Sequence, residues 1–249
     1  MQPLETNVAG SKSQMLRQLV CSWHYEDRAR EEYGATAIAG IDEAGRGCLA
    51  GACFAAAVVL DRSVVIADGG IRDSKMLASK KRERIAREIR DDAVCYAVAS
   101  VDAATIDRIN IAEAAKLAMA RAISALDPPP DFLLVDGFKL DHPLPQFVIA
   151  HGDGLSFSIA AASILAKVAK NDEMREMAAR YPGYGFESNM SYGTKDHLEA
   201  LRRLGPCPIH RETFQPVAQA EIPWNDGAPE CPSTTPPYQN ELIAIGRSF

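Results

Sequence analysis

The sequence lacks the features that assign many proteins to a class directly. No apolar run reaches the roughly 18 residues that cross a membrane, and residues 1–20 lack a basic start leading into an apolar stretch. The six cysteines form no C-x-x-C pair, so neither a zinc ribbon nor a thioredoxin-type site is indicated. The pattern G-x-x-x-x-G-K-[S/T] is also absent, which excludes a P-loop. We therefore expect a soluble, cytoplasmic protein, not attached to a membrane, whose cysteines are mostly buried thiols.

An excess of positive charge is missing too. The chain has 27 Lys and Arg against 33 Asp and Glu, a net charge of −6 that argues at first against a nucleic-acid partner. The distribution weakens that argument, because residues 36–216 hold 22 basic and 24 acidic residues and the two flanks hold the remaining excess. Between Arg72 and Arg90 there are eight basic and three acidic residues. This stretch is either a helix face that follows a phosphate backbone or an ordinary solvated helix.

What the sequence does contain is an ordinary globular composition arranged in three zones. The 249 residues are 47% hydrophobic and 24% charged, enough for one or two domains with a sizeable core. Residues 1–35 form an N-terminal extension, partly helical or disordered, in which apolar spacing predicts a helix over about 12–32. Residues 36–216 form the main domain. Residues 217–249 are rich in Pro, Ser, Thr and Gly, which predicts a disordered tail.

Within the main domain, segments typical of strands alternate with segments typical of helices. The predicted strands are 37–42, 53–60, 93–100, 132–136 and 147–150. The predicted helices are 79–90, 111–126, 155–179 and 194–204. This alternation indicates an α/β domain.

Acidic residues end three of the predicted strands. Asp42 and Glu43 follow the first, Asp136 ends another, and Asp153 comes shortly after a third. Carboxylates at neighbouring strand ends converge on one edge of a sheet, where Mg²⁺ or Mn²⁺ relieves their repulsion. Two such ions could act on a phosphodiester. Taken singly, each acid is more typical of a solvated strand end than of a catalytic group, so the prediction rests on the acids as a group.

A glycine-rich turn follows the first acidic pair directly. Gly45, Arg46 and Gly47 would let a ligand approach the backbone closely. With Ala50 the stretch also fits G-x-G-x-x-A, so a dinucleotide-binding turn is an alternative. Two acids separate this turn from its strand, however, and the next segment is typical of a strand rather than a helix.

Taken together, these motifs resemble ribonuclease HII, the type 2 ribonuclease H family, in the family's order over about 36–217. The matching segments are Ile41–Gly47 with Gly51, Asp73–Lys75, Leu134–Gly137, Ser158–Val168, Tyr181–Phe186, Tyr192–His197 and Pro208–Phe214. The resemblance implies a ribonuclease H-like α/β fold over 36–216, with a mixed β-sheet flanked by helices and a helical C-terminal portion.

The resemblance also implies an activity and assigns residues to it. It implies an endoribonuclease that cleaves the RNA strand of RNA–DNA hybrids and nicks 5′ to single ribonucleotides in duplex DNA, as in ribonucleotide excision repair. The implied catalytic metal ligands, for Mg²⁺ or Mn²⁺, are Asp42, Glu43, Asp136 and Asp153. The implied substrate contacts are Gly45, Arg46, Gly47 and Tyr192 at the ribose, and Lys75, Lys167 and Thr194 at phosphates. We expect a monomer.

The chain departs from the family pattern in a few places. Asn171 stands where a further Asp usually follows, Ala52 replaces a proline, and 187–191 replace a lysine-rich stretch. His197 and His210 are expected to make structural hydrogen bonds. In the tail, residues 239–244 resemble a motif that docks a sliding clamp, without its aromatic residue.

Three other functions stay open. A hybrid-binding protein without activity would fit if Asn171 marks a decayed site. A different nuclease or transposase-like enzyme on the same fold would cut DNA without ribose. A dinucleotide-dependent oxidoreductase would be stabilised by its cofactor.

Overall fold

The molecule is built on one mixed β-sheet of six strands in the order β5-β4-β1-β2-β3-β6. The computed structural model describes residues 21–63, 78–220 and 242–247. The strands are β1 (Ile38–Ala44), β2 (Cys53–Val59), β3 (Cys95–Val101), β4 (Phe132–Asp136), β5 (Gln146–Ile149) and β6 (Leu242–Arg247). β1, β2 and β3 are antiparallel neighbours, whereas β4 and β5 run parallel to β1. The predicted α/β class with a mixed sheet is confirmed.

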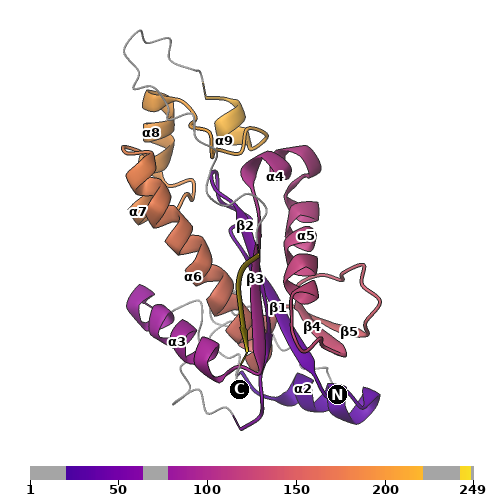
Figure 1. The fold of residues 1–249 in the computed structure, drawn as a ribbon. Coiled ribbons are helices and arrows are strands. Elements are labelled where there is room, and N and C mark those ends of the chain that lie inside the picture. Colours follow the sequence, from indigo (N-terminus) through magenta and orange to yellow (C-terminus); the bar gives the residue numbers. More distant parts are fainter. Residues whose placement is uncertain (1–20, 64–77, 221–241, 248–249) are drawn as a thin grey trace, which may run out of the picture.

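Helices cover both faces of this sheet. They are α2 (His24–Tyr33), α3 (Ser79–Asp92), α4 (Ala103–Ile109), α5 (Ile111–Ser124), α6 (Phe157–Arg180), α7 (Phe186–Asn189), α8 (Lys195–Leu204) and α9 (Gln215–Ala218). Figure 1 shows α6 and α3 on one side of the strands and α5 on the other. Because both faces are covered, β2 and β3 are buried at every position, which explains their continuous apolar runs.

Alternate residues of the strands build two separate cores. Phe54 and Val58 of β2 pack against α6 and α3, whereas Ala55 and Ala57 pack against α5. The contact of α6 with β1 is especially close at Gly40, where a Cβ would lie 2.1 Å from the backbone carbon of Ser158. The absent side chain therefore sets how near α6 lies to the strand that carries the first acids.

The C-terminal portion is helical, as predicted. α7 and α8 lie at the far end of α6 (Figure 1), and their apolar residues share a cluster with Met174 and Met177 of α6. The N-terminal extension contributes α2, whose buried Glu26 accepts hydrogen bonds from the Ser156 hydroxyl and the Ser158 amide at the start of α6. No helix in the described ranges is both long and apolar enough to cross a membrane.

Two differences from the sequence prediction concern individual elements. α4 was not predicted, and Asn110, with φ of 67°, both ends it and caps α5. β6 lies in the tail predicted to be disordered, and it pairs antiparallel with β3. Pairing with the exposed edge of a sheet gives the backbone a partner that local composition does not reveal. The Asp73–Lys75 motif and the rest of residues 64–77 lie outside the described residues.

Candidate active site

Two of the predicted acids lie side by side at the ends of neighbouring parallel strands. β1 and β4 pair with Ile41 opposite Val135, so the next residues along the strands are Asp42 and Asp136. Ile41 and Val135 belong to the core beneath α5. Since successive strand residues point to opposite faces, both acids face α6. The structure thus brings this pair together.

The Asp42 side chain is buried, with 4% of its surface exposed. Burial raises its pKa well above the usual range, and the charges of Glu43 and Asp136 raise it further. Lys167 and a hydrogen bond from Ser163, both on α6, act in the opposite direction. Asp42 therefore lies in a place where negative charge is costly and a cation would be favourable.

Glu43 belongs to the same electrostatic group but has its own partner. Burial raises its pKa, and Asp136 adds to this effect. Its carboxylate accepts a hydrogen bond from the Arg46 guanidinium at 3.2 Å. This bond connects Glu43 to the glycine turn that contains Arg46.

Asp153 lies in a short 3-10 helix, Gly152–Gly154, which follows β5. The Gly152 amide donates a hydrogen bond of 2.7 Å to Asp136, fixing this turn to the end of β4. Asp153 is buried, and its carboxylate lies 3.9 Å from the Lys167 ammonium. The charge of Lys167 also lowers the pKa of Asp42. One ammonium therefore interacts electrostatically with both Asp153 and Asp42.

The donor set fits a divalent cation in its chemistry. Carboxylate oxygens are the ligands that Mg²⁺ and Mn²⁺ prefer, and Asp136 raises the pKa of both Asp42 and Glu43, a repulsion that a cation relieves. In the part of the chain that is described, no three His, Cys, Asp or Glu side chains are arranged around a metal position. The acids instead contact Arg46, Gly152 and Lys167.

The Gly45–Gly47 turn lies directly beyond the acids. Gly45 has φ of 94°, and a Cβ there would lie 3.1 Å from the Ala52 carbonyl oxygen, so the turn requires glycine. Around Gly47, a Cβ would meet nothing within 4 Å. The turn is thus tightly packed at Gly45 and open at Gly47.

Tyr192 is brought to this turn from a distant part of the chain. The backbones of Cys48 and Tyr192 form an isolated antiparallel bridge. The tyrosine is 48% exposed, and the Lys170 ammonium lies 4.5 Å from its ring centroid. Lys170 also donates a hydrogen bond of 2.6 Å to the Met190 carbonyl. A half-exposed aromatic residue is therefore bridged through its backbone to Cys48, the residue that follows the glycine turn.

The other predicted contacts differ in position. Lys167 is partly buried among the acids, where it also donates a hydrogen bond to Ser163. Thr194 is exposed and caps α8, accepting a hydrogen bond from the His197 amide. Lys75 lies outside the described residues. Arg82 of α3 lowers the pKa of Tyr192 through its charge, so part of the basic helix lies within electrostatic range of the tyrosine.

Sequence reasoning did not assign roles to Arg211 and Glu173, which lie behind the turn. Arg211 is completely buried and donates hydrogen bonds to three carbonyls of the turn segment. Arg211 stands in a matching motif, but only the fold shows what it contacts. His197 and His210 hydrogen-bond to each other, as expected of structural histidines.

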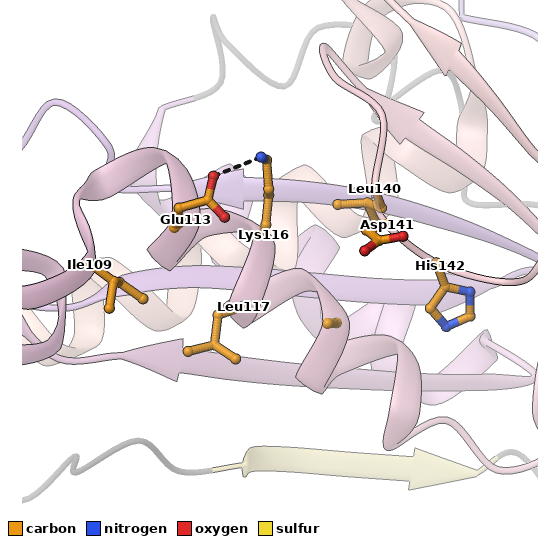
Figure 2. A pocket seen from close by; sticks show the side chains of 8 residues that line it. Ile109, Glu113, Lys116, Leu117, Leu140, Asp141 and His142 are labelled. Carbon is orange, nitrogen blue, oxygen red and sulfur yellow. Dashed lines mark hydrogen bonds and ion pairs between the residues drawn. The ribbon is translucent and has the colours of Figure 1, made fainter.

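A surface hollow of about 480 Å³ lies elsewhere, on the α5 side of the sheet (Figure 2). It is lined by Ile109, Glu113, Lys116, Leu117, Ala120, Leu140, Asp141 and His142. None of these residues belongs to the predicted site, so the acids and the hollow are separate features.

Comparisons with known proteins agree with the motifs. The family model described as Ribonuclease HII matches residues 39–217. The chain is 46% identical to the Ribonuclease HII of Koribacter versatilis over 217 residues, which are 87% of this chain and 84% of that protein. The ribonuclease H2 structure from Pyrococcus horikoshii OT3 is 25% identical with a TM-score of 0.64, covering 75% of this chain and 97% of that one. The PCNA:RNase HII complex from Archaeoglobus fulgidus matches with 28% identity and a TM-score of 0.58, covering 68% and 88%.

Proposed function

The chain belongs to the ribonuclease HII family, endoribonucleases that act on RNA–DNA hybrids, and from this premise we propose a more specific activity. As a monomer, it hydrolyses the RNA strand of hybrids and also nicks duplex DNA 5′ to a single embedded ribonucleotide, leaving 3′-OH and 5′-phosphate ends. The proposal is carried by one observation: Asp42 and Asp136 lie side by side on β1 and β4, and the strand with Asp42 continues into a turn that is open at Gly47.

Four carboxylates would hold the cations of this reaction. These carboxylates would be those of Asp42, Glu43, Asp136 and Asp153. When bound, two Mg²⁺ or Mn²⁺ ions supply the Lewis acidity for hydrolysis of the phosphodiester. Lys167 would offset part of the negative charge of this set, because its ammonium lies 3.9 Å from Asp153 and lowers the pKa of Asp42.

Recognition of ribose is assigned to the turn and the tyrosine. The 2′-hydroxyl is what distinguishes RNA from DNA at a given sugar. The backbone of Gly45, Arg46 and Gly47 can approach it because the turn is open at Gly47. The half-exposed Tyr192 ring can pack on the neighbouring sugar. Thr194 and Lys167 are proposed phosphate contacts, as is Lys75 outside the described residues.

The test is cleavage of a DNA duplex that contains one ribonucleotide, with Mg²⁺ and Mn²⁺ varied. We expect Asp136→Asn to lower kcat by at least about 100-fold, because a proposed metal ligand loses its charge. The amide oxygen of Asn can still accept from Gly152, so the melting temperature should stay close to wild type. Asp141→Asn, an exposed acid away from the site, is the matched control and should keep full activity.

Two results would contradict the proposal. One is an intact duplex after incubation of the wild-type protein with either metal. The other is full activity in Asp136→Asn. Cleavage of an all-DNA duplex at the same rate would instead support a different nuclease on this fold.

A clamp contact through residues 239–244 is a separate matter. The A. fulgidus relative was solved in complex with PCNA. In this chain, β6 (Leu242–Arg247) pairs with β3. Docking of that segment on a clamp would therefore require part of β6 to leave the sheet.

A further inference from the structure

The segment Arg46–Ala52, called here the recognition turn, has its carbonyl groups bonded by a buried arginine. The Arg211 guanidinium donates to the carbonyls of Gly51, Arg46 and Ala52 at 3.0, 3.1 and 3.1 Å. A planar guanidinium can hold several acceptors in fixed directions at once, which a lysine ammonium on a flexible stem cannot. Arg211 is fully buried, and a buried cation that loses its hydrogen bonds is costly. Conformations of the segment in which these carbonyls leave the guanidinium are therefore unfavourable.

Glu173 of α6 holds the same segment from the other side. Its carboxylate accepts the Ala52 amide at 3.1 and 3.4 Å. It also packs against Gly51, where a Cβ would lie 2.8 Å from its oxygen and 2.4 Å from Met174. The amide and the carbonyl of Ala52 are thus each bonded to a buried side chain, the amide to Glu173 and the carbonyl to Arg211.

The remaining bonds of the turn come from backbone on its two sides. The Leu49 amide donates to the Ser191 carbonyl, and the Leu49 carbonyl accepts from the Arg211 amide, each at 2.8 Å. The Gly51 amide donates to Ile209, and the Ser191 hydroxyl donates to Ala50. Five carbonyl groups of the turn are therefore engaged inside the protein, those of Arg46, Leu49, Ala50, Gly51 and Ala52.

The backbone amides at the tip of the turn, those of Arg46 and Gly47, differ from these groups in having no acceptor among the described residues. A tip whose two amides have no acceptor in the described protein presents donors to a ligand oxygen. That polarity matches the oxygen of a ribose 2′-hydroxyl.

We propose that Arg211 and Glu173 are positioning residues for ribonucleotide selectivity, which they provide by holding the recognition turn so that its tip amides face the 2′-oxygen. This rests on the proposed function of the turn. Neither side chain touches substrate, because both lie behind the turn and are buried. Hydrogen bonds that select a hydroxyl depend on placement, so a loosened turn loses selectivity before it loses general affinity.

The experiment measures binding of two duplexes that differ in one sugar, one all DNA and one with a single ribonucleotide. Cleavage is prevented by Asp136→Asn in every protein, with Mg²⁺ present. We expect Arg211→Lys to reduce the ratio of the two Kd values by about tenfold, while the Kd for all-DNA duplex stays within about twofold. Arg202→Lys, an exposed arginine on α8, is the matched control and should keep the wild-type ratio.

Glu173 provides a second test that does not depend on the arginine variant being folded. Glu173→Gln keeps an acceptor for the Ala52 amide, whereas Glu173→Ala removes it. We expect the alanine variant to lose the ribonucleotide preference and the glutamine variant to retain most of it. A role confined to general stability would make both variants change the two Kd values in parallel.

The possible failures are distinguishable. If the Asp136→Asn protein itself shows no preference for the ribonucleotide duplex, the proposed function of the turn is wrong. If it shows the preference, and Arg211→Lys and Glu173→Ala keep it while folded, the positioning role is overturned and the proposed function stands.

Discussion

Two buried histidines connect the C-terminal segment to the carbonyl of Tyr192. The Cys207 amide donates to Nδ1 of His210 at 2.9 Å, so the proton of neutral His210 is on Nε2. That Nε2 lies 3.2 Å from Nε2 of His197, whose Nδ1 lies 2.9 Å from the Tyr192 carbonyl. The chain of bonds is complete only when both rings are neutral, each with one proton.

This arrangement predicts a loss of stability in acid. Burial lowers the pKa of His210 to about 4, below its value of about 6.5 in an unfolded chain. The folded state therefore prefers neutral His210, and its contribution is present above about pH 6.5 and is lost as the pH falls toward 4. The difference in the free energy of unfolding is on the order of 3 kcal/mol.

Urea unfolding at pH 7 and pH 4.5 checks this prediction. Glu173 acts in the opposite direction, because burial raises its pKa to about 7 and the folded state gains from its protonation as the pH falls. The comparison must therefore be made between wild type and His210→Gln, which cannot gain a proton. We expect the variant to lose less stability over this interval; an identical loss in both proteins would contradict the assignment.

At the scale of elements, α6 connects the parts of the site. It carries Ser163 and Lys167 near the acids, and Lys170 and Glu173 near the recognition turn. Its distance from β1 is set at Gly40, where the Ser158 backbone leaves no space for a side chain. Site geometry should thus depend on a residue that contacts no substrate.

We expect Gly40→Ala to destabilise the protein by about 1–3 kcal/mol, the usual cost of overpacking, because α6 must move away from β1. Cleavage of the one-ribonucleotide duplex should fall with it, even below the melting temperature. Thermal unfolding and kcat of the folded variant are the measurements. A variant with wild-type values of both would show that α6 adapts without effect on the site.

Most of the helices and strands that build the site could be predicted from the sequence, and the exceptions have physical reasons. The predicted strand over 132–136 agrees with β4, and the acids at strand ends follow from such boundaries. α4 was missed because the helical spacing is interrupted at Asn110 by a single residue with positive φ. Arg211 could not be assigned, since its bond to Gly51 joins residues 160 positions apart and nothing local marks it.

For the whole molecule, β6 decides where the sheet ends. β3 pairs with β6 from Cys95 to Ala99, so removing residues 242–249 would leave that edge of β3 without its partner. We expect the shortened protein to melt at a lower temperature and to self-associate, because an exposed strand edge pairs with other chains. Light scattering and thermal unfolding check this; a monodisperse protein with an unchanged melting temperature would contradict it.

The hydrogen bonds that hold the recognition turn also determine when, during synthesis of the chain, the parts of the site can form. The carboxylates and the turn lie in residues 42–153, but Ser191, Ile209 and Arg211 are made later. A growing chain on the ribosome therefore acquires its acidic edge well before the turn can take its final shape. Since contacts this distant form late, selectivity for ribose should arise only after release of nearly the whole chain. A partly made protein would hold the acids without the means to choose a sugar.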